Sequence, residues 1–241
     1  MRRPADPPGS RQFPCLALLS AVTAALSLPL LMLFVDRPVA LAMKELPAWI
    51  ENGAEAITGL GKSLGWLLLS AGLALLWAAR AHLSDPASPA RHRYRQRAVA
   101  SAFLFAAVAV SGILANLIKL AVGRLRPDLF LNDGAYGFDP WHLDSDLRGF
   151  PSGHATTMFA LAFGIAVIRP AWRLPALAVA IVITATRVVI NAHYLSDVVG
   201  GLLVALATVW WLERAFDRRG WPFREYRDQP GTGDQKPSTA P

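Results

Sequence analysis

The chain has 241 residues, of which 54% are hydrophobic and 17% are charged, and its mean hydropathy is +0.35. A soluble domain carries roughly 25% charged residues, so this composition excludes a disordered chain and argues against an ordinary soluble globule. The single cysteine, Cys15, excludes a disulfide framework and a zinc site built on cysteines. The net charge of +7 is typical of nucleic-acid binding or of the cytoplasmic anchoring charge of a membrane protein.

Apolar runs long enough to cross a membrane recur along the chain, since a spanning helix needs about 20 mostly apolar residues. The first run is longer than the roughly 7–15-residue apolar core of a signal peptide, which is the alternative interpretation of it. The last run is too long for one span and fits two spans joined by a tight turn near residues 191–194. The sequence therefore predicts an all-α membrane bundle of six transmembrane helices. The expected spans lie at 14–35, 63–79, 98–118, 149–168 and, as a pair, within 174–212.

The positions of the positive residues predict the orientation of these spans. Most Arg and Lys residues fall in the two termini and in the second and fourth loops, and such loops face the cytoplasm. We therefore expect a multi-pass protein of the bacterial inner (plasma) membrane, with both termini cytoplasmic and no nucleic-acid partner. The expected parts are an N-terminal tail (1–13), a membrane domain (14–217) and a disordered C-terminal tail (218–241) rich in Pro, Gly and Asp.

The first outer connection, residues 36–62, carries apolar residues at helical spacing, interrupted by Pro47 and Gly53. This pattern favours a broken amphipathic helix on the outer membrane surface. An ordered loop packed on the bundle is the alternative. The apolar positions are Val39, Met43, Leu46, Ile50, Ile57 and Leu60.

A first cluster of ionisable residues ends the third span. Lys119 and Arg126 are seven residues apart, which is about two helical turns, so both share one face if the helix continues past Gly123. Pro127 would then end the helix, because the residue before a proline is pushed out of helical geometry. Such a pair can clamp an anion. Two anchors at the lipid headgroups are the alternative.

A second cluster, Pro151-Ser152-Gly153-His154, stands at the head of the fourth span. Proline and serine suit the start of a helix, and the free amides there bind phosphate. Gly153 lets the backbone approach a ligand, and His154 would point to the same place. The alternative is an ordinary capped helix with a histidine at the membrane interface.

The third cluster is Arg187, His193 and Asp197, near the predicted turn between the last two spans. His193 and Asp197 are four apart, so on a helix the carboxylate lies one turn from the imidazole and can accept its N–H. A turn between Arg187 and His193 lets both face the centre of the bundle. A structural His–Asp hydrogen bond is the alternative.

All three clusters lie on the outer side of the predicted bundle. Their three cations match the charge that spreads over a phosphoryl group during transfer. A neutral imidazole is a nucleophile near neutral pH, and a second histidine can protonate the leaving oxygen. No dense set of carboxylates accompanies them, so a two-metal hydrolase is not indicated, and we expect no metal and no cofactor.

At this point the sequence resembles the type-2 phosphatidic acid phosphatase superfamily. The family signature has three parts, K-x6-R-P, P-S-G-H and S-R-x5-H-x3-D, and all three occur here in order. They correspond to 119–127, 151–154 and 186–197. The one departure is Thr186, which stands where serine is usual and keeps the hydroxyl.

The resemblance implies a metal-independent lipid phosphatase with a phosphohistidine intermediate. In this family pattern His193 attacks phosphorus, Asp197 orients His193, and His154 protonates the leaving group and later activates water. The resemblance also implies the groups that hold the phosphate oxygens, which are Lys119, Arg126, Arg187, Ser152 and Gly153.

The implied substrate is a lipid phosphate at the periplasmic face, and the family offers undecaprenyl diphosphate, phosphatidylglycerol phosphate, phosphatidic acid and the phosphates of lipid A. Acidic residues in the loop 128–150 can contact sugar hydroxyls or a headgroup amine, or they are simply solvated. The rival functions are a lipid phosphotransferase and a non-catalytic lipid-phosphate binding or transport protein. A vanadate haloperoxidase shares the residue pattern, but those relatives are soluble and six predicted spans count against it.

Overall fold

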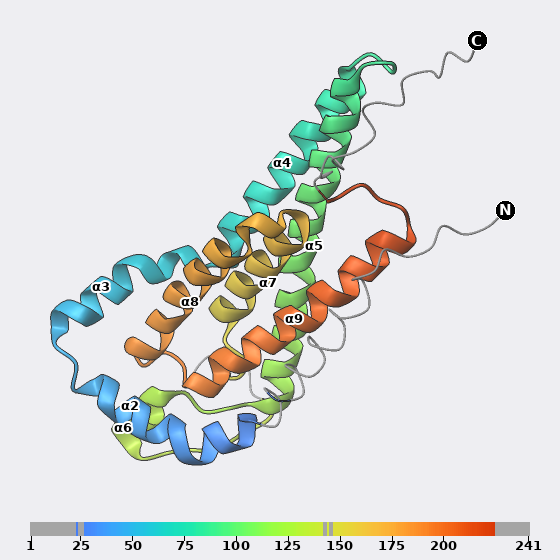
Figure 1. Ribbon diagram of the computed structural model, residues 1–241. Helices are drawn as coiled ribbons and strands as arrows, with labels where there is room; N and C mark the ends of the chain where they lie inside the picture. Colours follow the sequence, from blue (N-terminus) through green and yellow to red (C-terminus); the bar gives the residue numbers. More distant parts are fainter. Residues whose placement is uncertain (1–22, 24–26, 142–143, 145–146, 225–241) are drawn as a thin grey trace, which may run out of the picture.

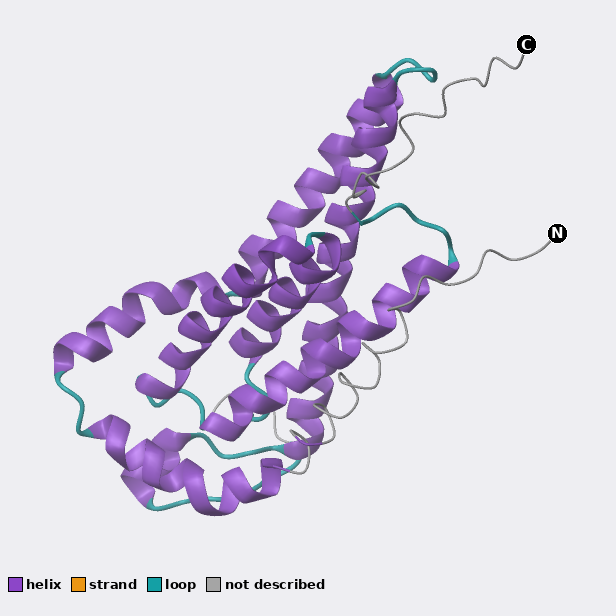
Figure 2. Cartoon of the chain, viewed as in Figure 1, coloured by secondary structure: helices purple, strands orange, loops and turns teal. Residues whose placement is uncertain are grey.

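The computed structural model describes residues 23, 27–141, 144 and 147–224, which fold as helices joined by loops (Figure 2). Within that part the strand-like pairing is an isolated antiparallel bridge between Arg124 and Phe138. The expected N-terminal tail and most of the expected C-terminal tail lie outside the described residues. The helices are η1 (Leu31–Val35), α2 (Asp36–Lys44), α3 (Ala48–Thr58), η2 (Gly59–Gly61), α4 (Ser63–Leu83), α5 (Pro89–Val122), α6 (Pro127–Asp133), α7 (Gly153–Ile168), η3 (Pro170–Trp172), α8 (Arg173–Val189) and α9 (Leu195–Arg218).

Four helical segments among the described residues are long and apolar enough to cross a membrane. The helix α7 is apolar but shorter, with 16 residues. The first predicted span, 14–35, lies mostly outside the described residues, so the count of six remains a prediction. The four long segments are Ala48–Leu83, Pro89–Val122, Pro170–Val189 and Leu195–Arg218.

The predicted turn between the last two spans is confirmed, because α8 ends at Val189 and α9 begins at Leu195. The first outer connection is helical, and the helix is interrupted between α2 and α3, just before Pro47, as predicted. The predicted interruption at Gly53 is wrong, because α3 runs through it. A single glycine weakens a helix by only about 1 kcal/mol, and α3 is held by its packing on α8. That this region lies on the membrane surface remains a prediction.

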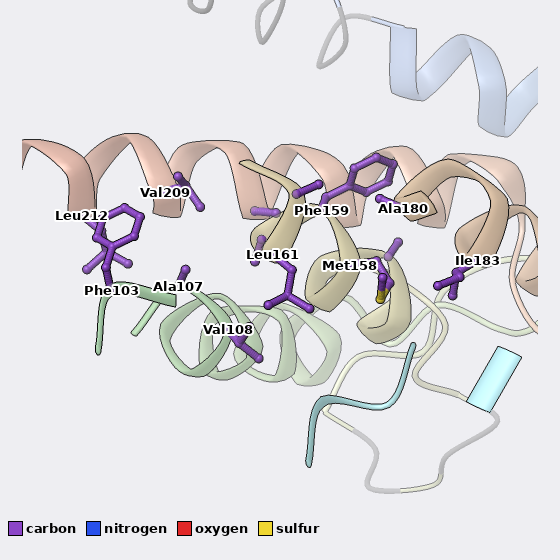
Figure 3. Close-up of a cluster of buried hydrophobic side chains, with 14 of the residues drawn as sticks. Phe103, Ala107, Val108, Met158, Phe159, Leu161, Ala180, Ile183, Val209 and Leu212 are labelled. Carbon is purple, nitrogen blue, oxygen red and sulfur yellow. The ribbon is translucent and has the colours of Figure 1, made fainter. Parts of the chain in front are cut away.

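The core sits around α7, which packs against α5, α8 and α9. Figure 3 shows its side chains Met158, Phe159 and Leu161 among those of the surrounding helices. A helix that is apolar on all sides is stable only when neighbours surround it, and nine of the 16 residues of α7 are buried. This burial fixes the position of the head of α7, where the second sequence cluster lies.

The outer faces of the bundle are apolar and exposed, as lipid contact requires. On α4 the exposed side chains include Leu64, Leu68 and Leu75, and on α8 they include Val179 and Ile181. Figure 1 shows α2 and α6 gathered at the end of the bundle where α5 ends and α9 begins. The three sequence clusters meet at this end.

Candidate active site

Backbone hydrogen bonds join the three sequence clusters at one end of the bundle. The Ser152 N–H donates to the Asp197 carbonyl at 2.9 Å, and the Gly149 N–H donates to the Arg124 carbonyl at 2.7 Å. Ser152 thereby ties the head of α7 to the first turn of α9, and Gly149 ties the segment before α7 to the chain after α5. All eight predicted site residues lie here: Lys119, Arg126, Ser152, Gly153, His154, Arg187, His193 and Asp197.

The third span does not continue as a helix past Gly123, so the condition under which Lys119 and Arg126 would share one helical face is not met. Gly123 adopts a left-handed backbone, φ +57°, and ends α5; a Cβ there would lie 1.8 Å from the Asp139 carbonyl oxygen. Pro127 does not end a helix either, because it is the first residue of α6, where a missing N–H costs nothing. Lys119 and Arg126 still come close enough for their charges to interact, because the chain folds back after Gly123.

Lys119 is a buried cation in the last turn of α5, and its side chain is 9% exposed. Its Nζ donates to the Arg148 carbonyl at 2.7 Å and to the Gly149 carbonyl at 3.4 Å. These two acceptors are uncharged, so the ammonium charge is not neutralised by them. Lys119 therefore places a positive charge between the end of α5 and the segment that leads into α7.

The second cluster starts α7 as the sequence predicts. Ser152 is the N-cap, and its Oγ accepts from the Ala155 N–H at 3.5 Å. Gly153 is the first helical residue, and a Cβ at Gly153 would meet nothing within 4 Å. The head of α7 thus offers free amides next to an open space, which is the arrangement that anions favour.

His154 packs against the short helix that joins α3 to α4. A Cβ on Gly61 would lie 2.5 Å from the His154 Cδ2, so only glycine leaves room for the imidazole at this position. His154 also lies within range of the charges of Arg187, His193 and Lys62. Gly61 therefore helps to direct the His154 ring toward the other two clusters.

Arg187 is in the last turn of α8 and points toward α3. Its Nη1 donates to the Thr58 Oγ1 at 3.0 Å, and its carbonyl accepts from the His193 N–H at 3.0 Å. The turn after α8 therefore brings Arg187 and His193 to the same place, as the sequence predicts. Thr186, the departure from the family pattern, donates its hydroxyl to the Ile183 carbonyl at 2.6 Å.

His193 and Asp197 face each other, but not through a close hydrogen bond. The Nδ1 of His193 lies 3.5 Å from the Asp197 Oδ2, and that oxygen accepts from the Tyr194 N–H at 2.9 Å. The other carboxylate oxygen, Oδ1, accepts from Arg124 at 2.5 Å. The structure thus gives Asp197 a buried cationic partner that the sequence analysis did not identify.

Burial lowers the pKa of His193 to about 4, and the positive charges of Lys119 and Arg126 act in the same direction, while Asp197 opposes them. The imidazole is therefore neutral near pH 7. With Nδ1 facing Asp197, the lone pair of a neutral ring is available at Nε2. His193 thus meets the chemical requirement for a nucleophile near neutral pH.

Buried nitrogens without a hydrogen-bond partner gather at this end of the bundle. Among the described residues they include the Nε atoms of Arg126, Arg148 and Arg187 and the Nδ1 of His193. Buried polar atoms are almost always paired, so a cluster of unpaired ones marks a place where a ligand can supply the partners. Arginine donors suit phosphate oxygens above other ligands.

Three residues near the site escape the sequence analysis. Arg148, whose charge lies close to that of Lys119, adds a fourth cation. Arg124 and Asp36 form a buried ion pair at 2.7 Å, and each side chain is at most 1% exposed. The sequence signal of Asp36 and Arg124 is that each is a charged residue at the end of an apolar run. A charge near the membrane interior is energetically costly, so its presence indicates a specific role.

Residues 100–221, about half of the chain, match the PAP2 superfamily. The chain belongs to the PAP2 superfamily. Family membership makes the protein a membrane lipid phosphatase of the PAP2 type, as its sequence motifs predict. The three clusters described above all lie within or beside the matched region.

Similar proteins include two bacterial enzymes, each named lipid A 1-phosphatase. The one from Rhizobium johnstonii is 39% identical over 174 residues, which cover 71% of this PAP2 chain and 69% of the relative. The one from Rhizobium etli is 39% identical over 180 residues, with coverage of 71% and 72%. The fold is similar to a crystal structure of a transmembrane PAP2-type phosphatidylglycerolphosphate phosphatase from Bacillus subtilis, with a TM-score of 0.56, 21% identity and coverage of 88% and 98%.

Proposed function

We propose that this protein removes the 1-phosphate of lipid A through a phosphohistidine on His193. The observation that supports the mechanism is the buried, neutral His193, which faces Asp197 and lies among the charges of Lys119 and Arg126. Support for the substrate comes from the two Rhizobium relatives. Undecaprenyl diphosphate, phosphatidylglycerol phosphate and phosphatidic acid are the other lipid phosphates to be compared.

The first half-reaction transfers the phosphoryl group to the enzyme. The Nε2 lone pair of His193 forms the N–P bond as the P–O bond to the lipid breaks. The electron pair of that bond goes to the leaving oxygen, which takes a proton from His154, because the anionic phosphate of the bound lipid favours the protonated form of that imidazole. Lys119, Arg126 and Arg187, with Ser152 and the Gly153 amide, hold the phosphate oxygens, where negative charge is spread in the transition state.

The second half-reaction releases phosphate. His154, now neutral, takes a proton from a water molecule as the water oxygen bonds to phosphorus. The N–P bond breaks and its electron pair returns to Nε2 of His193. The products are the dephosphorylated lipid and inorganic phosphate, and His154 is protonated for the next cycle.

The site opens to the outer leaflet in this proposal. The Arg-rich start of α5 lies at the opposite end of the bundle from the three clusters, and arginines favour the cytoplasmic side. From this distribution we infer that both termini are cytoplasmic and that the site lies at the periplasmic face of the inner membrane. A lipid phosphate of the outer leaflet then reaches the site without leaving the membrane.

The test is release of inorganic phosphate from four lipids by the purified full chain in detergent, with EDTA present. The panel holds lipid A with both phosphates, phosphatidic acid, phosphatidylglycerol phosphate and undecaprenyl diphosphate. We expect release from lipid A, with a product that keeps the 4′-phosphate by mass spectrometry. His193→Ala should abolish release, whereas His92→Ala, an exposed histidine near the other end of α5, should not change it.

Each outcome of this test has a distinct meaning. Preference for another lipid in the panel would contradict lipid A as the proposed substrate but would remain consistent with the proposed mechanism. Transfer of the phosphoryl group to a lipid acceptor without inorganic phosphate would instead identify a phosphotransferase. Activity that survives in His193→Ala would contradict the phosphohistidine mechanism.

A further inference from the structure

Arg124 is a buried cation held between two buried carboxylates. Its Nη2 donates to the Asp36 Oδ2 at 2.7 Å, and its Nη1 donates to the Asp197 Oδ1 at 2.5 Å. The side chains of all three residues are at most 1% exposed. Asp36 begins α2, Arg124 follows α5, and Asp197 is in the first turn of α9, so the three residues tie separate elements together.

Arg124 has no donor at its terminal nitrogens left for a phosphate. Its Nη1 also donates to the Ser196 Oγ, and its Nη2 also donates to the Tyr136 hydroxyl at 3.0 Å. Three aromatic rings, those of Tyr136, Phe138 and Tyr194, enclose the guanidinium, with centroids 4.5 to 5.9 Å from its central carbon. Its role therefore differs from that of Lys119, Arg126 and Arg187.

The backbone and hydroxyl of Ser196 complete the connection to α2. The Ser196 N–H donates to the Asp36 Oδ1 at 3.0 Å, and its hydroxyl donates to the Asp36 Oδ2. Asp36 is thus bonded to the residue directly before Asp197 as well as to Arg124. These bonds orient the first turn of α9, from which the Asp197 side chain projects toward His193.

The charges of the group leave one net negative charge beside His193. Two carboxylates and one guanidinium sum to minus one, and the Asp197 oxygen that is not bonded to Arg124 is the one that faces the imidazole. The other charged or titratable groups around His193 include Lys119, Arg126, Arg187 and His154. These groups disfavour a positive charge on the imidazole, so Asp197 is the group that can stabilise such a charge. Asp36 offsets part of the Arg124 charge, which would otherwise neutralise the Asp197 carboxylate.

We propose that Asp36 and Arg124 are positioning residues that fix the Asp197 carboxylate against His193 and keep it anionic while the phosphohistidine forms. This inference rests on the proposed function. The imidazole gains positive charge as its Nε2 bonds to phosphorus, and the anionic carboxylate at Nδ1 stabilises that charge. Loss of Asp36 leaves Arg124 paired with Asp197 alone, which weakens this stabilisation without touching the phosphate-binding groups.

The experiment compares Asp36→Asn with the wild type, using lipid A in mixed micelles. We expect kcat to fall by about 10- to 100-fold, because a misplacement of about 1 Å at the reacting groups can cost a factor of about 100. KM should stay within about threefold, because Lys119, Arg126 and Arg187 are unchanged. The acid limb of the pH profile of kcat/KM should move to lower pH, because a negative charge near His193 has been removed.

The matched control is Asp217→Asn, which removes a carboxylate from an exposed ion pair with Arg224 and should leave all three quantities unchanged. A merely structural role would lower the fraction of active enzyme and leave the pH profile and KM in place. An unmoved acid limb, or a rise in KM with kcat preserved, would therefore overturn the proposal.

A second variant guards against failure of Asp36→Asn to fold. Ser196→Ala removes only the hydroxyl between Arg124 and Asp36, and it should lower kcat by about threefold with KM unchanged. Unaltered kcat in Ser196→Ala overturns the proposal if Asp36→Asn cannot be purified. The positioning role alone would be rejected if the wild type is active, His193→Ala is inactive and Asp36→Asn behaves like the wild type. An inactive wild type would instead reject the proposed function.

Discussion

The buried imidazole of His193 should make the protein less stable in mild acid. Burial holds its folded-state pKa at about 4, below the value of about 6.5 for an exposed histidine. The unfolded chain therefore binds a proton first as the pH falls. The contribution to stability is complete above pH 6.5 and is lost as the pH drops toward 4.

The size of the effect follows from these two pKa values. Proton binding by the unfolded state lowers the free energy of unfolding by about 2 kcal/mol at pH 5 and about 3 kcal/mol at pH 4, relative to pH 7. His193→Gln cannot titrate, so this part of the pH dependence should disappear in that variant. The control variant His92→Gln, at an exposed position, should keep the full pH dependence of the wild type.

The assay is unfolding by sodium dodecyl sulfate in mixed micelles at pH 7 and pH 5, followed by tryptophan fluorescence. The loss of unfolding free energy between the two pH values should be about 2 kcal/mol greater in the wild type than in His193→Gln. Equal losses in the two proteins would refute the reasoning, because they would show that His193 takes up its proton equally well in the folded and unfolded states.

Further predictions concern the site and its neighbours. Gly61→Ala should displace His154 and lower kcat by about 10- to 100-fold, whereas Gly59→Ala, where a Cβ meets nothing within 4 Å, should not. Arg148→Gln should raise KM about tenfold with kcat little changed, because one charge-assisted contact to phosphate is lost, and equal KM values would contradict a role in binding. Activity should persist in EDTA, and orthovanadate should inhibit phosphate release; strict dependence on Mg²⁺ would exclude the metal-independent mechanism.

The four long helical segments and the turn between the last two could be predicted because their signals are local. A charge-free run indicates a helix of the membrane bundle, and the stretch 174–212 is too long for one helix, so a turn near residues 191–194 follows from length alone. The clusters at Ser152 and His193 were found the same way, because their residues are close in sequence. Local sequence patterns therefore predict the long apolar helices and the polar residues at their ends.

The remaining features depend on tertiary contacts. Asp36 and Arg124 are 88 residues apart, so no periodicity along the chain reports their ion pair. The spacing of Lys119 and Arg126 fits a helix that continues past Gly123 as well as one that ends there, so the sequence does not fix the end of α5. Glycine is required at position 123 by the close approach of the Asp139 carbonyl, which only the folded chain brings there.

The short length of α7 has a consequence for how a lipid reaches the phosphate site. Its 16 residues rise about 24 Å, less than the roughly 30 Å hydrocarbon thickness of a bilayer. A helix of this length cannot reach both headgroup layers, and in the proposed orientation we expect the amides at its head to lie at or below the level of the lipid phosphates. In that orientation we expect lipids to enter sideways from the leaflet and depth in the membrane to select the substrate. Phosphates anchored by acyl chains would arrive at the level of the site, whereas soluble phosphate esters would have to leave water to reach it.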